Sequence, residues 1–218
     1  DVQTGDSINK VTISTDTTID LNGHTLTISK ANQFFEVQSG AKLTIKDSQA
    51  PEETVTEPGG TVYGNKAKLE NDTLTYYITE STPNDTGTKE TLKEHTVPLA
   101  GAGKILCQEA SEQAIKVQTG GTLELRSGVL QNKGGKHIVY MEGGTLDVNG
   151  GYIVGGGDDN TPGGGIYVNS GTVNIQGGVV AANRGRSGGG IFVNSGTLNI
   201  SGGAVTGNEV INGHTDNG

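Results

Sequence analysis

The stretch GGGIYVNSGTVNI, residues 163–175, decides the fold because it returns almost unchanged as GGGIFVNSGTLNI at residues 188–200. In each copy a threonine opens the second apolar segment, and the same threonine is found in two earlier, more divergent copies. The equivalent residues Thr122, Thr145, Thr172 and Thr197 are separated by 23, 27 and 25 residues. A recurring period of this length is typical of proteins built from stacked repeats.

Three short strands are expected in each repeat, with Gly and Asn at the corners between them. In the most regular copy they cover residues 165–168, 172–175 and 178–183. Successive side chains of a strand point to opposite faces, so the second strand turns apolar residues inward in every copy: Leu123 and Leu125, Leu146 and Val148, Val173 and Ile175, Leu198 and Ile200. Three strands per coil without helical periodicity predict an all-β fold. We expect a single-stranded right-handed parallel β-helix like that of pectate lyases, with coils about 4.8 Å apart.

The repeat pattern divides the chain into three parts. Residues 1–47 carry divergent coils, and residues 104–218 carry the regular coils of the same continuous solenoid. Between them, residues 48–103 interrupt the pattern with a Pro- and Glu-rich linker and two strand-like segments, 73–80 and 89–99. Because this segment is longer than an ordinary loop, we expect an inserted β-hairpin. We also expect the chain to be a fragment of a longer protein.

The charge balance bears on possible partners. The chain has 24 acidic and 15 basic residues and a formal charge of -9, whereas nucleic-acid binding requires clustered Lys and Arg. No apolar run approaches the roughly 20 residues that a membrane-spanning helix requires. We therefore expect no nucleic-acid partner and no membrane-embedded segment.

The single cysteine, Cys107, alternates with apolar residues in the segment ILCQ and cannot form an internal disulfide. We expect it to be a small buried strand residue. The alternative is a thioester formed by the Cys-Gln pair, of the kind that some Gram-positive adhesins use to couple to their hosts.

The glycine and asparagine positions resemble a known repeat family. GGGI followed by VAAN at 180–183, and again by VTGN at 205–208, resembles the GGA[I/L] and FxxN repeats of chlamydial polymorphic outer membrane proteins and related autotransporter passenger domains. The segment LNGHTLTI, residues 21–28, is similar to β-helix domains of large surface proteins of gut Firmicutes. These resemblances imply an extracellular adhesin or stalk on a bacterial cell surface. They imply a host glycan or host protein as partner and bring no catalytic residue or cofactor.

Stacking the coils places aromatic residues above one another. Tyr140, Tyr167 and Phe192 occupy equivalent outward positions in the first strand of successive coils, about 4.8 Å apart. Lys116 ends this row one coil earlier. The row is either cross-strand support for the sheet or an exposed contact stripe for a sugar or protein. We therefore take the three aromatic residues as candidate binding residues.

A second candidate site lies in the loops after the third strand. Their charges alternate in sign from coil to coil: Lys133, Lys136 and His137, then Asp158 and Asp159, then Arg184 and Arg186, then Glu209, His214 and Asp216. Equivalent loops lie along one edge of a solenoid, so this pattern predicts a salt-bridged edge or a binding surface formed by Asp158, Asp159, Arg184 and Arg186. The same two aspartates offer oxygen ligands for adventitious calcium, although we predict no dedicated metal site.

Catalysis is the alternative function, because right-handed β-helices also include polysaccharide lyases and glycoside hydrolases. An enzyme of this kind acting on acidic polysaccharide requires two carboxyl groups at a set separation, or carboxylate-bound calcium beside a base. Asp158 and Asp159 are adjacent in a glycine loop, and the NGHT motifs at 22–25 and 212–215 have no Arg-x-Lys partner. We therefore predict no catalytic residue. Ice binding uses Thr-x-Thr ladders on the outer face. Only Thr25 and Thr27 fit there, because the later coils carry Glu124, Asp147, Asn174 and Asn199 instead.

Overall fold

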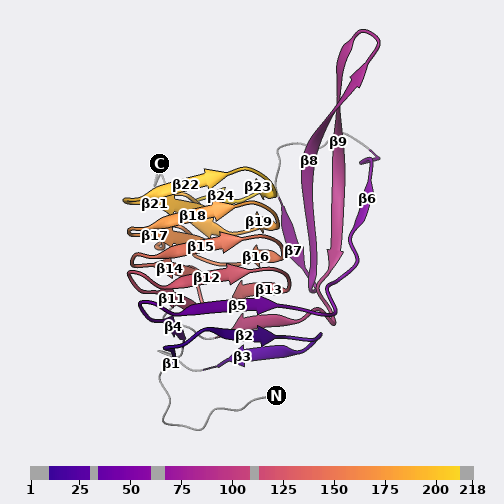
Figure 1. Ribbon diagram of the computed structural model, residues 1–218. Coiled ribbons are helices and arrows are strands. Elements are labelled where there is room, and N and C mark those ends of the chain that lie inside the picture. Colours follow the sequence, from indigo (N-terminus) through magenta and orange to yellow (C-terminus); the bar gives the residue numbers. More distant parts are fainter. Residues whose placement is uncertain (1–9, 30–33, 60–66, 109–112, 212–218) are drawn as a thin grey trace, which may run out of the picture.

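The computed structural model describes residues 10–29, 34–59, 67–108 and 113–211, and in these ranges the chain winds into a parallel β-helix (Figure 1). Three sheets of six parallel strands each form its walls. Each coil contributes one strand to each sheet, and every strand pairs with its equivalents in the neighbouring coils. The predicted all-β fold with three strands per coil is confirmed.

The three walls are named here sheets A, B and C. Sheet A consists of β1 (Val11–Ile13), β4 (Phe35–Val37), β11 (Ile115–Val117), β14 (Val139–Met141), β17 (Ile166–Val168) and β21 (Ile191–Val193). Sheet B consists of β2 (Thr17–Asp20), β5 (Lys42–Lys46), β12 (Thr122–Leu125), β15 (Thr145–Val148), β18 (Thr172–Ile175) and β22 (Thr197–Ile200). Sheet C consists of β3 (Thr25–Ile28), β10 (Lys104–Cys107), β13 (Val129–Asn132), β16 (Tyr152–Val154), β19 (Val179–Ala181) and β23 (Ala204–Thr206). In the loops after sheet C, β20 (Arg184–Gly185) pairs with β24 (Glu209–Val210). None of the described residues belongs to a helix that could cross a membrane.

The register between coils confirms the alignment of the repeats. Thr122 pairs with Thr145, Thr145 with Thr172, and Thr172 with Thr197. The residues predicted to face inward from β12, β15 and β18 are fully buried. In β22 the inward Ile200 is 55% exposed, because no described coil of the chain covers it.

The interior is a stack of aliphatic side chains. Leu43, Leu123 and Leu146 come from successive strands of sheet B and are fully buried in one apolar cluster that runs through the β-helix. Burying an aliphatic side chain of this size contributes about 1.5–3 kcal/mol. Short rows of Val, Ile and Leu thus stabilise a fold that has very few large aromatic residues.

Glycine at the corner between sheets A and B is required by the stacking of the coils. Gly171 has a φ of +99°, and a Cβ atom at this position would lie 2.4 Å from the carbonyl oxygen of Gly144 in the preceding coil. An L side chain fits neither the backbone conformation nor the space. The glycine that precedes the threonine of each repeat is therefore a packing requirement.

The asparagine at the end of each repeat caps the turn after sheet C. Asn183 is fully buried; its Nδ2 donates to the carbonyl of Ile153 (2.9 Å), and its Oδ1 accepts from the N–H of Gly156 (2.9 Å). In the next coil, Asn208 Nδ2 donates to the carbonyl of Val180 (2.8 Å), and its Oδ1 accepts from the N–H of Asn183 (3.1 Å). VAAN and VTGN both end in Asn because one side-chain amide satisfies buried backbone groups of adjacent turns.

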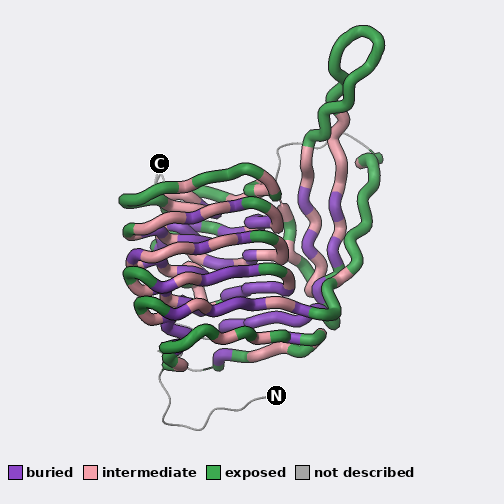
Figure 2. The backbone as a smooth tube through the Cα atoms, viewed as in Figure 1, coloured by how far each residue is buried: buried purple, intermediate pink, exposed green. Residues whose placement is uncertain are grey.

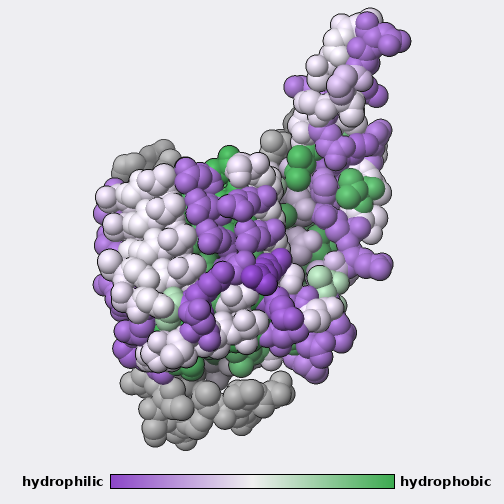
Figure 3. Space-filling view, in the orientation of Figure 1, coloured by the Kyte–Doolittle hydropathy of each residue, from purple (hydrophilic) through white to green (hydrophobic). Residues whose placement is uncertain are grey.

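The outer face of sheet B carries a polar ladder along the coil axis. Asn199 Nδ2 donates to Asn174 Oδ1 (2.8 Å), and Asn174 Nδ2 donates to Asp147 Oδ1 (2.8 Å). Hydrophilic side chains gather over this sheet in Figure 3. One coil earlier, Glu124 is held by Arg126 and Lys42, and these two cations lower the pKa of its carboxyl group to about 2.

The segment between β5 and β10 forms a separate four-stranded antiparallel sheet. Its strands, in the order β6-β9-β8-β7, are β6 (Thr54–Thr56), β9 (Gly87–Pro98), β8 (Thr73–Asn84) and β7 (Lys68–Glu70). β8 and β9 pair along their whole length, so the predicted inserted hairpin is confirmed. Its outer half is exposed on both strands and projects away from the β-helix (Figures 1 and 2).

The inner half of the inserted sheet packs on the outer face of sheet C. A second apolar cluster joins the two parts and includes Leu74, Tyr76, Val97, Leu99, Val129, Val154 and Val179. Thr206 Oγ1 also donates to the carbonyl of Tyr77 (3.1 Å), and Lys104 Nζ lies 3.6 Å from Asp72 Oδ2. Within the described residues, sheet C is therefore covered on both faces, unlike sheets A and B.

Candidate functional site

The three aromatic residues predicted to stack do so on the outer face of sheet A. Tyr140 of β14, Tyr167 of β17 and Phe192 of β21 pair in register. The ring centroids of Tyr140 and Tyr167 are 5.4 Å apart at an interplanar angle of 3°, and those of Tyr167 and Phe192 are 5.5 Å apart at 20°. All three residues are half-buried. They are called the aromatic row below.

His137 joins the aromatic row from the loop before β14. Its ring centroid lies 5.5 Å from that of Tyr140 and 5.5 Å from that of Tyr167. Burial lowers the pKa of the imidazole to about 4, with the charge of Lys136 as a smaller cause. The ring is therefore neutral at pH 7. From the sequence, His137 was grouped with the charged loop residues. Side chains in a loop do not alternate between two faces as they do in a strand, so the contact with the aromatic row could not be predicted.

Lys116 ends the row on its N-terminal side, as the sequence predicted. It pairs with Tyr140 in the register of sheet A, and its Nζ lies 5.8 Å from the centroid of the Tyr140 ring. The same Nζ forms an ion pair with Glu142 at 3.1 Å. A cation in this position is attracted by the ring face, so Lys116 both terminates and stabilises the row.

The stacking determines what the aromatic row offers to a partner. The ring faces of Tyr140 and Tyr167 that point along the coil axis cover each other. A strip of ring edges therefore faces outward, together with the hydroxyl groups of the two tyrosines. Such a strip combines apolar surface with hydrogen-bonding groups, which is the chemistry that makes Tyr frequent at interfaces.

Asp158 and Asp159 form a turn in the loop after β16. Asp158 Oδ1 accepts hydrogen bonds from the N–H of Asn160 (3.0 Å) and from Thr161 Oγ1 (2.7 Å). Asp159 Oδ1 accepts one from Asn160 Nδ2 (3.1 Å). Among the described residues, no three His, Cys, Asp or Glu side chains lie close enough together to hold a metal ion. Asp158 thus forms an Asx-type turn, and Asp159 contacts the side chain of a residue in the same turn.

The structure brings two of the loop charges together across neighbouring coils. Arg184 Nε lies 3.6 Å from Glu209 Oε2, at the point where β20 pairs with β24. Both side chains are exposed, so the pair is worth at most about 1 kcal/mol. Arg186 is also exposed, and it forms no ion pair with another described residue. His214 and Asp216 lie outside the described residues.

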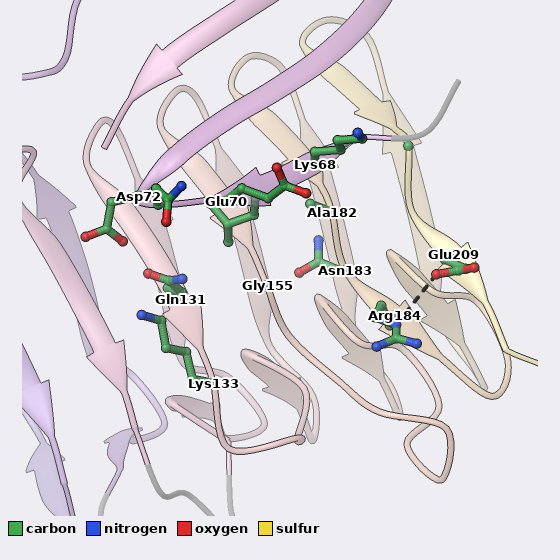
Figure 4. Close-up of a pocket in the computed structure, with 14 residues that line it drawn as sticks. Lys68, Glu70, Asp72, Gln131, Lys133, Gly155, Ala182, Asn183, Arg184 and Glu209 are labelled. Atoms are coloured by element: carbon green, nitrogen blue, oxygen red, sulfur yellow. Dashed lines mark ion pairs between the residues drawn. The ribbon is translucent and has the colours of Figure 1, made fainter. Parts of the chain in front are cut away.

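A groove that the sequence did not predict runs between β7 and the loops after sheet C (Figure 4). Its volume is about 500 Å³. The inserted segment supplies one wall, with Lys68, Glu70 and Asp72. Successive coils supply the other wall: Gln131, Lys133, Gly155, Ala182, Asn183, Arg184, Gly207 and Glu209. The groove therefore follows the coil axis and is lined by charges of both signs.

Gln131 carries an unsatisfied polar atom at this groove. The residue is 2% exposed, and its Oε1 has no hydrogen-bond partner among the described residues. In sheet C it occupies the position that Val154 and Ala181 occupy in the next two coils. Its neighbour in the preceding coil, Leu106, is apolar as well, and a polar residue between apolar neighbours was the signal in the sequence. Gln131 Oε1 is therefore an unused acceptor in a residue that lines the groove.

Cys107 lies in β10 and is fully buried in the apolar cluster of the β-helix. Burial raises the pKa of its thiol to about 12. The neighbouring Gln108 is exposed. This is the environment of a strand residue in the core and not of a reactive thiol.

Comparisons of the chain with protein-family models, with curated proteins and with solved structures found no match. The functional inference therefore depends on the surfaces described above, of which the aromatic row is the most regular.

Proposed function

We propose that this chain is a non-catalytic extracellular β-helix domain of a bacterial cell-surface protein, an adhesin or stalk that binds a host glycan or a host protein. The observation that carries the proposal is the aromatic row, in which Tyr140, Tyr167 and Phe192 come from three coils and form one half-buried strip. The resemblance of the GGGI and VAAN repeats to autotransporter passenger domains supports the same placement outside the cell.

The rest of the fold supports a binding role. A β-helix is a rigid scaffold, because each coil is hydrogen-bonded to both neighbours along three sheets. It presents equivalent side chains at a constant spacing of about 4.8 Å. A row of three rings on such a scaffold loses little conformational entropy when a partner binds.

The test is a variant with Tyr140→Ser, Tyr167→Ser and Phe192→Ser. Its control replaces three outward residues of sheet B in the same coils, as Asp147→Ser, Asn174→Ser and Asn199→Ser. Both variants are first compared with the parent by circular dichroism and denaturant unfolding. Binding is then measured on host cells, a glycan array and host surface proteins.

We expect the aromatic variant to lose binding and the sheet B variant to retain it. Loss of the aromatic row with no change in binding to any of these probes would show that the row serves only the stability of sheet A.

The alternative is a β-helix lyase or hydrolase acting on acidic polysaccharide. The geometry of the candidate carboxylates does not support it. Asp158 and Asp159 are engaged in their own turn. Turnover of an acidic polysaccharide by the intact chain, in the presence or absence of calcium, would favour this alternative over the adhesin.

A further inference from the structure

A second concave site lies between the inserted sheet and the β-helix, away from the β7 edge that lines the groove of Figure 4. Its volume is about 370 Å³, which falls in the range of small-molecule sites. The inserted segment contributes Glu53, Tyr76, Ile78 and His95 to its walls. The β-helix contributes Tyr152, Val179, Ala204 and the glycine corners of three coils. This site is called the interface cleft.

Three side chains of the interface cleft form a hydrogen-bonded group. Glu53 Oε1 accepts from the hydroxyl of Tyr76 and lies 3.0 Å from His95 Nδ1. The rings of Tyr76 and His95 stack with centroids 4.8 Å apart and planes at 15°. Tyr76 is 2% exposed and His95 is 8% exposed. The imidazole is therefore held in one orientation from two sides.

This arrangement fixes the hydrogen-bonding character of His95. A carboxylate only accepts hydrogen bonds, so Nδ1 carries the proton that points to Glu53. In the neutral ring Nε2 is then an acceptor. It is buried, and it has no hydrogen-bond partner among the described residues. A buried acceptor without a donor destabilises the protein, and a donor from a ligand in the cleft would satisfy it.

Other groups of the cleft define the chemistry of that ligand. Glu53 is 31% exposed in its side chain, and its hydrogen bonds to Tyr76 and His95 both use Oε1. Its Oε2 is therefore a second acceptor. Burial, and to a smaller extent the charge of Glu53, raises the pKa of Tyr152 to about 12. The Tyr152 hydroxyl remains protonated at neutral pH and can donate a hydrogen bond.

The charges and the apolar walls of the interface cleft further restrict the chemical class of its ligand. The described residues that line the cleft include a carboxylate and no Lys or Arg, so an anionic ligand would be repelled. Ile78, Val179 and Ala204 supply apolar surface beside the polar groups. A ligand with two hydroxyl donors, one acceptor and an apolar C–H face matches this lining. A pyranose has all of these features.

We propose that the interface cleft binds one neutral sugar residue, whose hydroxyl groups donate to His95 Nε2 and Glu53 Oε2. This site is separate from the aromatic row, because the cleft lies between the inserted sheet and the corners of sheets B and C, whereas the row lies on sheet A. The inference therefore stands or fails independently of the proposed function.

The experiment follows the ring nitrogens of His95 by ¹⁵N NMR in the full chain while methyl pyranosides of glucose, galactose and mannose are added at millimolar concentration. Glucuronic acid serves as the anionic comparison. The variants are Glu53→Gln and His95→Asn, and His24→Asn is the matched control because His24 is exposed. The serine variant of the aromatic row is titrated in parallel.

We expect at least one neutral sugar to shift the Nε2 signal of His95. Glu53→Gln should weaken its binding at least about tenfold, and His24→Asn and the aromatic-row variant should bind as the parent does. If His95→Asn fails to fold, Glu53→Gln carries the test, because it preserves the size of the side chain.

Four results would overturn the proposal. The first three are an Nε2 signal that no neutral sugar shifts, glucuronic acid binding more tightly than every neutral sugar, and sugar binding that Glu53→Gln leaves unchanged. Binding lost only in the aromatic-row variant would likewise move the sugar site to sheet A.

Discussion

Tyr140 and Tyr167 lie one coil apart with their ring centroids 5.4 Å from each other and their planes 3° from parallel. Tyr167 also stacks on Phe192 and on His137, whereas Phe192 has Tyr167 as its stacking partner among the described rings. Removing the middle ring, Tyr167, therefore breaks more stacking contacts than removing Phe192.

We expect Tyr167→Ser to lower the free energy of unfolding by about 2–3 kcal/mol and Phe192→Ser by about 1–2 kcal/mol, since each ring pair is worth about 0.5–1.5 kcal/mol beyond burial. Denaturant unfolding at pH 7 measures both. Equal costs for the two variants would contradict the assignment of Tyr167 as the centre of the stack.

His137 should make stability depend on pH. Its pKa is about 4 in the folded chain and about 6.5 in an unfolded one. Between these values the unfolded state binds more protons, so stability falls as the pH drops from about 6.5 to about 4, by at most about 3 kcal/mol. Unfolding free energies at pH 7 and pH 5 should differ more for the parent than for His137→Phe.

The carboxylate of Glu124 contributes little to this comparison. Arg126 and Lys42 lower the pKa of Glu124 to about 2 from an ordinary value of 4.5, so the stability due to that group is lost only as the pH falls below about 4.5. A parent and a His137→Phe variant with the same change between pH 7 and pH 5 would show that the imidazole is not the titrating group.

Gly207 and Ala182 occupy the same position of the repeat, and opposite substitutions there should have opposite effects. A Cβ atom on Gly207 would lie 2.1 Å from the backbone nitrogen of Ala67, which donates to the Gly207 carbonyl. We expect Gly207→Ala to cost about 1–3 kcal/mol and to speed hydrogen exchange in β7. Ala182 has a φ of +52°, so Ala182→Gly should be neutral or stabilise by up to about 1 kcal/mol.

Gln131→Met should stabilise the chain by about 1 kcal/mol, because it removes a buried carbonyl that has no donor among the described residues. Thermal and denaturant unfolding measure the change. The exposed Gln176, replaced in the same way, is the control and should change little. Destabilisation by Gln131→Met would mean that the amide has a partner in solution.

Cys107 should resist alkylation in the native chain, because its thiol is fully buried and burial raises its pKa to about 12. Labelling should become fast in denaturant, and its native rate should follow the unfolding rate. Rapid labelling of the folded chain would contradict the buried position.

Much of the fold could be predicted from the sequence, because several copies of the repeat show the same pattern of apolar, polar and glycine positions. Alternation in the second strand gave the inward residues of sheet B, and equivalence between copies placed Tyr140, Tyr167 and Phe192 in one row. The inserted hairpin followed from the break in the period. Its docking surface did not follow, although Tyr152–Val154 and Val179–Ala181 are apolar at every position, which is typical of a strand covered on both faces.

The candidate sites were less predictable, for two physical reasons. Loop residues have no alternation, so neither the stacking of His137 on the row nor the turn made by Asp158 could be derived from spacing. The groove and the interface cleft are formed by residues far apart in the chain, such as Glu53, His95 and Tyr152. These residues do not recur at the period of the repeats, so the repeat pattern does not show that they lie close together.

The ladder formed by Asn199, Asn174 and Asp147 has a direction. Each asparagine donates to the residue of the preceding coil and keeps an acceptor for the next one, whereas Asp147 only accepts. Duplication of a coil that carries Asn at this position can lengthen the ladder after Asp147 without leaving an amide unpaired. The same duplication placed before Asp147 would bring an asparagine between the carboxylates of Glu124 and Asp147. Repeats of this kind can therefore multiply toward the C-terminal end more readily than toward the insertion.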